Sequence, residues 1–487
     1  MNRRSAGRLL AAALTLALAA LPAVVQGSGF QLFEQNASGL GNAYAGQAAG
    51  VKNASAIFFN PAALTRVKGW NVVASIEPID LSTTFTNTAS TGPYFPTPTG
   101  GKLPFPVPLG DTGGNAGNWI PVPSGYVSGE VASRVFVGVG VNVPFGLQTE
   151  WSSTFMGRFR TTKSKVQTVN VNPTVAFQVN DALSLGVGAN YQHLSADLNQ
   201  MVAYGSLAYG ESAAAIAGLP LPPAVQGALL ASILGQLGGP AGLAVEGPAL
   251  LSGTSDAWGW NAGALLKLGK QAHVGVSYRS KITHDVSGTI TFQGAPKLSE
   301  GGLTGPIGAA INAGFADGPV TTQIKLPDTV SVAGAWENEK LELLADWTWT
   351  GWSSIPALTV YRSGATTPVE NVPLSFRDTW RAGLGANVKM NEAWTLRLGT
   401  AYDKSPVQDV YRTPRLPDNN RVWAAGGVQW RASDKVHVDL SYAHLFLKNA
   451  PSNLPNMDSA TAVPVGDLIG EYNASVNIVG AQLSLHF

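Results

Sequence analysis

The chain has 487 residues, with 31 Lys and Arg against 30 Asp and Glu, and it contains no cysteine. Only 13% of the residues are charged, where soluble domains average about 25%. The balanced charge excludes a basic surface for nucleic acid, and the lack of cysteine argues against a disulfide-stapled secreted fold. We therefore expect much of the surface not to face water.

The start of the chain has the pattern of a secretory signal, and residues 1–27 are assigned to a signal peptide. Arg3, Arg4 and Arg8 precede an apolar run from Leu9 to Ala20, as in exported proteins. After this segment, Gly, Asn, Ser or a charge interrupts every apolar stretch before it reaches the roughly 20 residues of a transmembrane helix. A helical inner-membrane transporter is excluded.

Residues 28–68 differ from the rest of the chain because they show no alternation of apolar and polar residues. They are dense in Gly, Ala, Ser and Asn, which makes them too polar and too small to face lipid. We expect this segment to fill the interior of a wide structure as a plug.

From about residue 70 the chain alternates apolar and polar residues with a period of two, which indicates strands. One strand carries valine on one face, at Val135, Val137, Val139, Val141 and Val143. Aromatic residues end several apolar sets, as membrane barrels place them at the lipid interfaces; examples are Trp258, Tyr278, Trp394, Tyr402 and Tyr442. A soluble β-sandwich also alternates.

The connections favour a barrel over a sandwich, because short polar turns alternate with long irregular segments. Outer-membrane barrels have this arrangement, with the short turns in the periplasm. The six short turns are Ser133-Arg134, 180–182, 269–271, 338–340, 391–393 and 433–435.

These turns join six strand pairs, and one strand at about 70–86 and another at about 471–487 complete the set. The sequence thus predicts an all-β fold, a 14-stranded antiparallel transmembrane β-barrel over residues 69–487, whose even strand number allows closure. The last strand ends in Phe487, which resembles the signal that the barrel assembly machinery recognises. We expect a monomer in the bacterial outer membrane.

The expected extracellular loops are of two kinds. Residues 92–123 are rich in Pro and Gly and should be irregular, whereas residues 201–256 contain a helical face at Val225, Leu229, Ile233 and Leu237 after Pro222-Pro223. A second short helix is expected over Pro306 to Phe315. These apolar helices either pack on one another or form a groove that captures an apolar ligand.

The plug segment carries recognisable motifs: Gly29-Phe30-Gln31-Leu32, Ala37 to Gly46, and Asn60-Pro61-Ala62. They resemble the N-terminal hatch of the FadL family of outer-membrane long-chain fatty acid transporters, which includes proteins for aromatic hydrocarbons. The resemblance implies a hatch over residues 28–68 inside a 14-stranded barrel, capture in extracellular loops, and exit through the wall after hatch movement.

By the same resemblance, Gly29, Phe30, Asn60, Pro61 and Ala62 are hatch residues, with Phe30 near a lumenal ligand site. The family's lateral exit lies at a kink in the third strand. Here the matching strand runs from Val135 to Gly146, and Pro144 and Gly146 are the residues expected to interrupt its pairing.

Uptake of a fatty acid requires no cofactor, metal or catalytic residue, only apolar surface and a cation for the carboxylate. Alternation places Arg279, Arg377 and Arg381 on the lumenal face as candidates. The alternative, favoured for any single one of them, is that the arginine pairs with a lumenal acid and braces the barrel. A further cationic group is expected to meet lipopolysaccharide or water: Arg158, Arg160, Lys163 and Lys165.

Three other functions compete with fatty acid uptake. The first is uptake of neutral aromatic or aliphatic hydrocarbons by the same fold, which needs no cation. The second is an outer-membrane hydrolase using His193, His273 or His437, for which no Ser-His-acid grouping is legible. The third is an open porin, against which the plug argues.

Overall fold

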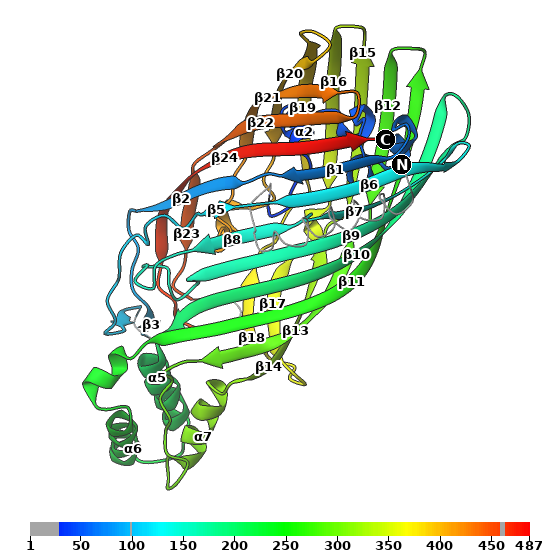
Figure 1. The fold of residues 1–487 in the computed structure, drawn as a ribbon. Coiled ribbons are helices and arrows are strands. Elements are labelled where there is room, and N and C mark those ends of the chain that lie inside the picture. The colour runs from blue at the N-terminus through cyan, green and yellow to red at the C-terminus, as the bar shows by residue number, and fades with distance from the viewer. Residues whose placement is uncertain (1–28, 98–99, 458–462) are drawn as a thin grey trace.

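A closed antiparallel barrel of 14 transmembrane strands forms most of the protein (Figure 1), as the sequence predicted. The computed structural model describes residues 29–97, 100–457 and 463–487, so the predicted signal peptide lies outside the described residues. The final strand pairs with the first, beginning with Asn71 opposite His486. Closure leaves no strand edge facing lipid.

Eight of the transmembrane strands are interrupted and consist of two segments each. They are β1 (Asn71–Ile76) with β2 (Ile79–Asn87), β5 (Trp119–Ile120) with β6 (Pro123–Ala132), β7 (Val135–Asn142) with β8 (Gly146–Glu150), β12 (Ala272–Arg279) with β13 (Ile282–Phe292), β14 (Gly318–Leu326) with β15 (Thr329–Glu337), β16 (Leu341–Thr350) with β17 (Ala357–Arg362), β18 (Pro368–Pro373) with β19 (Thr379–Lys389), and β22 (Val436–Leu447) with β23 (Ala450–Leu454). The other six are continuous: β9 (Lys163–Gln178), β10 (Leu183–Val202), β11 (Gly247–Leu268), β20 (Trp394–Asp403), β21 (Arg421–Ser433) and β24 (Leu468–His486).

The two faces of the strands meet different surroundings, as the alternation predicted. Along β10, Gly186, Gly188 and Asn190 face the interior, while Leu185 and Val187 are 45% and 54% exposed on the outside. Paired aromatic rings mark the outer surface, for example Tyr191 against Trp258, with ring centroids 5.2 Å apart. The outside is therefore apolar where it meets lipid and aromatic near the interface.

All six predicted short turns occur, and they lie at the end of the barrel that also holds the last residue of β24 (Figure 1). The opposite end carries the long connections. There the prediction of a loop over residues 201–256 was too long, because β11 begins at Gly247 and spans 22 residues. About ten residues suffice to cross the membrane, so β10 and β11 project well beyond it.

The helices outside the lumen gather beyond this far end (Figure 1). Helices α6 (Pro223–Gln236) and α7 (Gly305–Gly314) were predicted. Helix α5 (Tyr204–Ala217) was not predicted as a separate helix. The remaining short elements are η2 (Pro240–Ala244), η3 (Trp352–Ser354), η4 (Asp409–Tyr411) and the hairpin of β3 (Tyr94–Pro96) and β4 (Lys102–Pro104). Within the described ranges, no helix is both long and apolar enough to cross a membrane.

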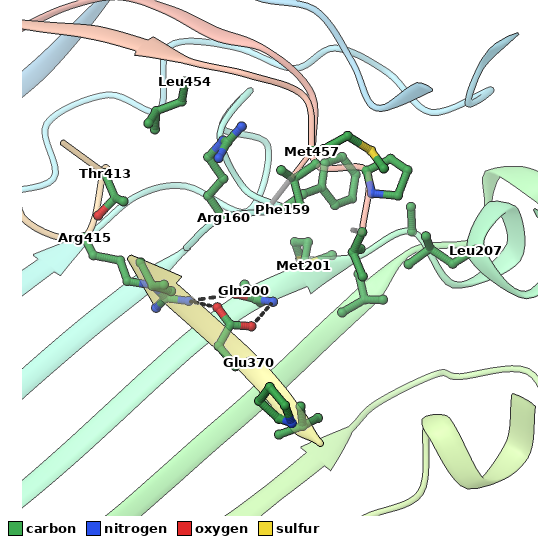
Figure 2. A pocket seen from close by; sticks show the side chains of 18 of the residues that line it. Phe159, Arg160, Gln200, Met201, Leu207, Glu370, Thr413, Arg415, Leu454 and Met457 are labelled. Atoms are coloured by element: carbon green, nitrogen blue, oxygen red, sulfur yellow. Dashed lines mark hydrogen bonds and ion pairs between the residues drawn. The ribbon is translucent and has the colours of Figure 1, made fainter. Parts of the chain in front are cut away.

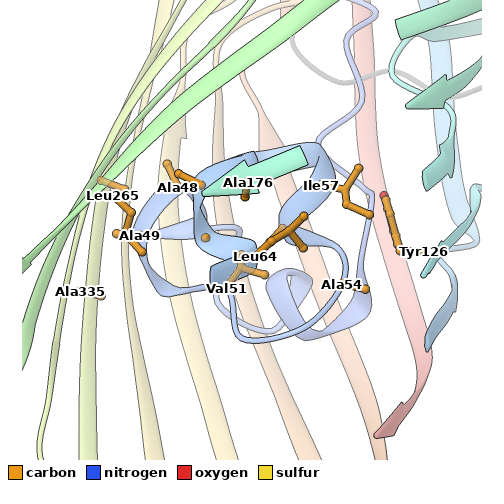
Figure 3. Packing of buried hydrophobic residues seen from close by; sticks show 14 of the residues in the cluster. Ala48, Ala49, Val51, Ala54, Ile57, Leu64, Tyr126, Ala176, Leu265 and Ala335 are labelled. Atoms are coloured by element: carbon orange, nitrogen blue, oxygen red, sulfur yellow. The ribbon is translucent and has the colours of Figure 1, made fainter. Parts of the chain in front are cut away.

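The plug segment forms four short helical turns inside the barrel: α2 (Ala37–Leu40), α3 (Gln47–Gly50), α4 (Ala56–Phe59) and η1 (Pro61–Arg66). Their small apolar side chains pack against strands on several sides of the wall, for example Ile57 near Tyr126 and Ala49 near Leu265 (Figure 3). The hatch residues therefore occupy the lumen, and the hydrophobic core of the protein lies between hatch and wall.

Candidate functional site

Asn60 ties the hatch together and to the barrel wall. Its side chain accepts a hydrogen bond from the Ala62 backbone N–H at 3.0 Å, which caps η1, and Pro61 occupies the first helical position, where no N–H is needed. Its amide nitrogen donates to the Ala48 carbonyl at 2.7 Å and to the Ala264 carbonyl of β11 at 3.1 Å. The Asn-Pro-Ala motif thus combines a helix cap with a clamp.

The hatch lies so close to the wall that glycine is required at the contact points. A Cβ on Gly275 of β12 would lie 1.9 Å from the Ala48 carbonyl oxygen, and one on Gly399 of β20 would lie 2.1 Å from the Asn42 backbone. Small residues on both surfaces therefore close the lumen by backbone contact.

The third transmembrane strand is interrupted between β7 and β8, and the structure places Pro144 inside this break and Gly146 at the first residue of β8. Pairing of β7 with β6 ends at Val141 opposite Gly125. Among the described strands, β8 pairs with β9 and with no strand on its other side. One stretch of the wall therefore lacks strand-to-strand hydrogen bonds.

The start of the hatch covers this break from the inside. The Leu32 N–H donates to the Pro144 carbonyl at 2.9 Å, and the Gly146 N–H donates to the Phe30 carbonyl at 2.8 Å. Gln35 adds a side-chain clamp, since its Nε2 donates to the Val143 carbonyl at 2.7 Å. The hatch thus supplies the partners that the neighbouring strand does not.

Phe30 sits in an aromatic cluster between the break and the far wall. Its ring lies 5.0 Å from Trp352 and 6.0 Å from Phe145, and Trp352 also contacts Phe376 at 5.9 Å, all in edge-on geometry. Gly29 beside it donates its backbone N–H to Asp418 at 2.9 Å. These contacts fill the lumen above the hatch with apolar surface.

An apolar cavity of about 560 Å³ opens on the extracellular side (Figure 2). It lies between the end of β10, the start of α5, strand β18 and the loops that follow β20 and β23. The apolar side chains that line it include Phe159, Met201, Leu207, Phe292, Phe315, Val369, Val372, Leu454 and Met457. The helical face predicted at Val225, Leu229, Ile233 and Leu237 does not line this cavity. Leu229, Ile233 and Leu237 pack with side chains of α5 and α7 instead, and the cavity wall contains α5 and the end of α7.

One side of the cavity is polar and carries two arginines (Figure 2). Arg415 donates to Gln200 Oε1 at 2.7 Å and lies 3.5 Å from a Glu370 carboxylate oxygen. Arg160 donates to the Gly466 carbonyl at 2.8 Å. Such a cavity can hold a long apolar chain together with an anionic headgroup.

The three arginines predicted as carboxylate ligands occupy different places, and none of them lines this cavity. Arg377 is exposed beside the Ser405 and Pro406 carbonyls. Arg381 is buried, forms an ion pair with Asp346 at 3.2 Å and donates to the Ala43 carbonyl of the hatch. Arg381 therefore braces the barrel against the hatch, which is the alternative role that the sequence analysis gave for these arginines.

Arg279 is buried and contacts the hatch, donating to the Phe58 carbonyl at 2.9 Å and to Asn190 Oδ1. Its guanidinium also lies 4.4 Å from the Phe58 ring centroid. Five other arginines of the described chain are buried, and each has a carboxylate within 4.0 Å: Arg158, Arg381, Arg412, Arg415 and Arg421. No ion pair involves Arg279 in this part of the chain, so its charge is not neutralised by a carboxylate.

The expectation for the loop cations was wrong in part. Arg158 does not face water or lipopolysaccharide, because it is buried and pairs with Glu246 at 2.9 Å. Arg160 lines the cavity instead. Sequence reasoning also missed Arg415 and Glu370. The only local signal for Arg415 is a group of arginines in the proline-containing loop after β20, and Glu370 of β18 has no such signal.

Glu34 is an unusual hatch residue, fully buried with no hydrogen-bond partner for either carboxylate oxygen among the described groups. Burial raises its pKa to about 7. The backbone N–H of Glu34 itself, Arg421 and Arg381 oppose this shift, and nearby Asp403 adds to it. The hatch therefore holds a carboxyl group that titrates near neutral pH. The described residues contain no cluster of three or more acidic or His side chains suited to a metal ion.

Comparison with known proteins agrees with this geometry. Residues 18–487 match the family model described as outer membrane protein transport protein (OMPP1/FadL/TodX). The chain belongs to this family. It is therefore an outer-membrane transport protein for hydrophobic compounds.

Relatives and solved structures extend the match over the whole barrel. The long-chain fatty acid transport protein of Escherichia coli K12 is 27% identical over 439 residues, covering 89% of this chain and 91% of that protein. The crystal structure of a Pseudomonas aeruginosa FadL homologue has a TM-score of 0.77 at 25% identity, covering 94% of this chain and all of that one. The Pseudomonas putida toluene transporter TodX shares the fold, with a TM-score of 0.60 at 15% identity, covering 95% of this chain and 100% of that one.

Proposed function

We propose that this FadL-family protein takes up long-chain fatty acids across the outer membrane. The observation that carries the proposal is the extracellular cavity, which joins an apolar lining to Arg160 and Arg415 on one side. An apolar chain gains roughly 0.8 kcal/mol for each CH₂ group it buries. A guanidinium adds a charge-assisted hydrogen bond to the carboxylate.

The cavity is the entry to a path that continues past Phe30 into the lumen. There Arg279 offers a buried guanidinium that forms no ion pair with a carboxylate among the residues the structure describes, so it is suited to receive the headgroup of an anionic ligand. The hatch segment that begins at Phe30 closes the break in the third strand, and its withdrawal would open the wall to the membrane at Pro144. We infer that the ligand leaves by this lateral route, and we infer no catalytic step.

A second candidate cargo is a neutral hydrocarbon. The observation that favours it is that Glu370 already lies 3.5 Å from Arg415, one of the two arginines that line the cavity. Charges paired in this way leave an apolar cavity that needs no anionic ligand. The same protein would then act on aliphatic or aromatic compounds through the same path.

Binding of a fatty acid and of the alcohol of equal chain length distinguishes the two cargoes. We expect Arg279→Gln and Arg415→Gln each to weaken binding of the acid about tenfold or more, since hydrogen bonds to charged groups are worth about 1.5–3 kcal/mol. The alcohol should bind the variants almost as it binds the unchanged protein. Arg377→Gln, which alters an exposed arginine outside the cavity, is the matched control.

Equal loss of both ligands in both variants, or no loss of either, would contradict the fatty acid proposal. The second result favours the neutral cargo. Growth of a deletion strain on oleate or on toluene then tests the choice in cells.

A further inference from the structure

Buried amide side chains form a hydrogen-bonded chain from the break in the third strand to the middle of the hatch. Asn170 of β9 donates to Asn142 at 3.1 Å and to Asn190 of β10 at 3.1 Å. Asn142 is the last residue of β7, directly before the break. The chain therefore starts where the third strand loses its regular pairing.

At Asn190 the chain divides into two branches that both end on the hatch. In one, Asn190 donates to Asn261 of β11 at 3.0 Å, and Asn261 donates to the Ile57 carbonyl at 3.2 Å. In the other, Arg279 donates to Asn190 and to the Phe58 carbonyl at 2.9 Å. Ile57 and Phe58 lie just before the Asn60-Pro61-Ala62 motif.

Every side chain in this relay is buried: Asn142, Asn170, Asn190, Asn261 and Arg279. Water cannot easily replace a lost partner there, so breaking one bond leaves a desolvated donor or acceptor. Since Asn190 serves both branches and Asn170, a shift of residues 57–58 must be accommodated by reorganisation of the amides toward Asn142.

We propose that this amide relay couples the position of hatch helix α4, which contains Ile57 and Phe58, to the opening of the break in the third strand. Asn142, Asn170, Asn190 and Asn261 are positioning residues for transport, since they act through the hatch and the wall. Gln35 holds the break directly at Val143, and the relay adds a second connection from residues 57–58. The two connections let hatch movement and opening of the wall occur together, whatever the cargo.

A double-mutant cycle with a single reporter tests the coupling. The chain contains no cysteine, so Val143→Cys provides a unique thiol at the break whose maleimide labelling rate reports its opening in membranes. Asn60→Ala loosens the hatch outside the relay. Asn170→Leu cuts the relay while keeping a side chain of similar size.

With the relay intact, we expect Asn60→Ala to raise the labelling rate by roughly fivefold or more, the lower end of typical coupling between sites. In the Asn170→Leu background the same change should raise the rate much less. Thr174→Val is the matched control, because Thr174 faces inward on β9 and its hydroxyl has no hydrogen-bond partner among the described groups. In the Thr174→Val background, Asn60→Ala should raise the labelling rate by the same factor as in the otherwise unchanged chain.

The proposal is overturned if Asn60→Ala raises labelling by the same factor with and without Asn170→Leu, or does not raise it at all. If Asn170 has only a structural role, each single substitution changes the labelling rate, and the change in the double variant is the product of the two separate changes. If Asn170→Leu does not assemble into a heat-stable barrel, Asn261→Leu takes its place, and partial loss of the factor is then expected because the Arg279 branch remains.

Discussion

The side-chain amide of Gln35 pairs with the backbone of Val143 on both sides, with Nε2 2.7 Å from the Val143 carbonyl and Oε1 3.3 Å from its N–H. The Gln35 carbonyl in turn accepts from Ser124 at 2.9 Å and from Tyr126 at 3.0 Å. One hatch residue therefore connects β6 with Val143, the first residue of the break after β7. It stands in for the ladder hydrogen bonds that end at Val141.

Replacing Gln35 with Ala should open the break. The Val143 carbonyl and N–H would be left buried without partners, at a cost of about 1–3 kcal/mol for each such group. We expect faster uptake of a labelled fatty acid into proteoliposomes. Gln47→Ala, a half-buried hatch glutamine with a weak contact to Asn36 at 3.4 Å, should leave the rate nearly unchanged, and equal rates in all three proteins would contradict the role of Gln35.

Asn60 combines two functions that can be separated by substitution. Asn60→Ala removes both the cap of η1, worth about 1 kcal/mol, and the donors to Ala48 and Ala264. Asn60→Ser keeps a capping oxygen but cannot supply both amide hydrogen bonds. We expect single-channel conductance in planar bilayers to rise in the Ala variant and to take an intermediate value in the Ser variant; identical conductance for the two variants would assign the whole effect to the clamp.

The barrel was predictable because its signals are local. Alternation such as Leu185 followed by Gly186 indicates which face of a strand meets lipid, and a short polar turn indicates where one strand ends and its partner begins. The same reasoning failed at the start of β11, where Ala249 and Leu251 face inward while Ser252 and Thr254 face outward. This part of the strand projects beyond the lipid, so its outer face meets water and is polar, while its inner face is apolar.

The site was less predictable because it joins segments that are far apart in sequence. Gln200, Glu370 and Arg415 meet only because β10, β18 and the loop after β20 converge at the extracellular end. Nothing in the local pattern of any one segment indicates the other two. The Asn60-Pro61-Ala62 motif was recognisable because its residues are adjacent in the sequence and resemble those of the family's hatch, although its role as a helix cap was not predicted.

Filling the extracellular cavity should block both kinds of cargo. Met201 lines the cavity near Phe159 and Leu207 (Figure 2), and Met201→Trp would occupy part of its volume. We expect weaker binding of a fatty acid and of its alcohol by similar factors, measured by displacement of a fluorescent fatty acid. Met390→Trp, in an exposed turn at the opposite end, is the control; retained binding by Met201→Trp would exclude the cavity as the entry site.

The buried carboxyl group of Glu34 should make closure of the hatch depend on pH. Its pKa rises from 4.5 to about 7 in the closed hatch, so the closed state holds a proton that a hydrated, released hatch would lose. The closed hatch is therefore most stable below pH 4.5, loses stability as the pH rises to about 7, and changes little above that. The full difference is about 3 kcal/mol at most, from 1.36 kcal/mol for each pKa unit.

Glu34→Gln keeps the shape of the side chain but cannot ionise, so it should remove this dependence. With Ala49→Cys as a unique buried hatch thiol, we expect maleimide labelling to accelerate between pH 5 and 7 in the otherwise unchanged chain, after correction for thiol ionisation. The Glu34→Gln variant should show a nearly constant corrected rate, while Glu130→Gln, which alters an exposed carboxyl on β6, should behave like the parent. A parent rate that is flat across this range would show that ionisation of Glu34 does not loosen the hatch.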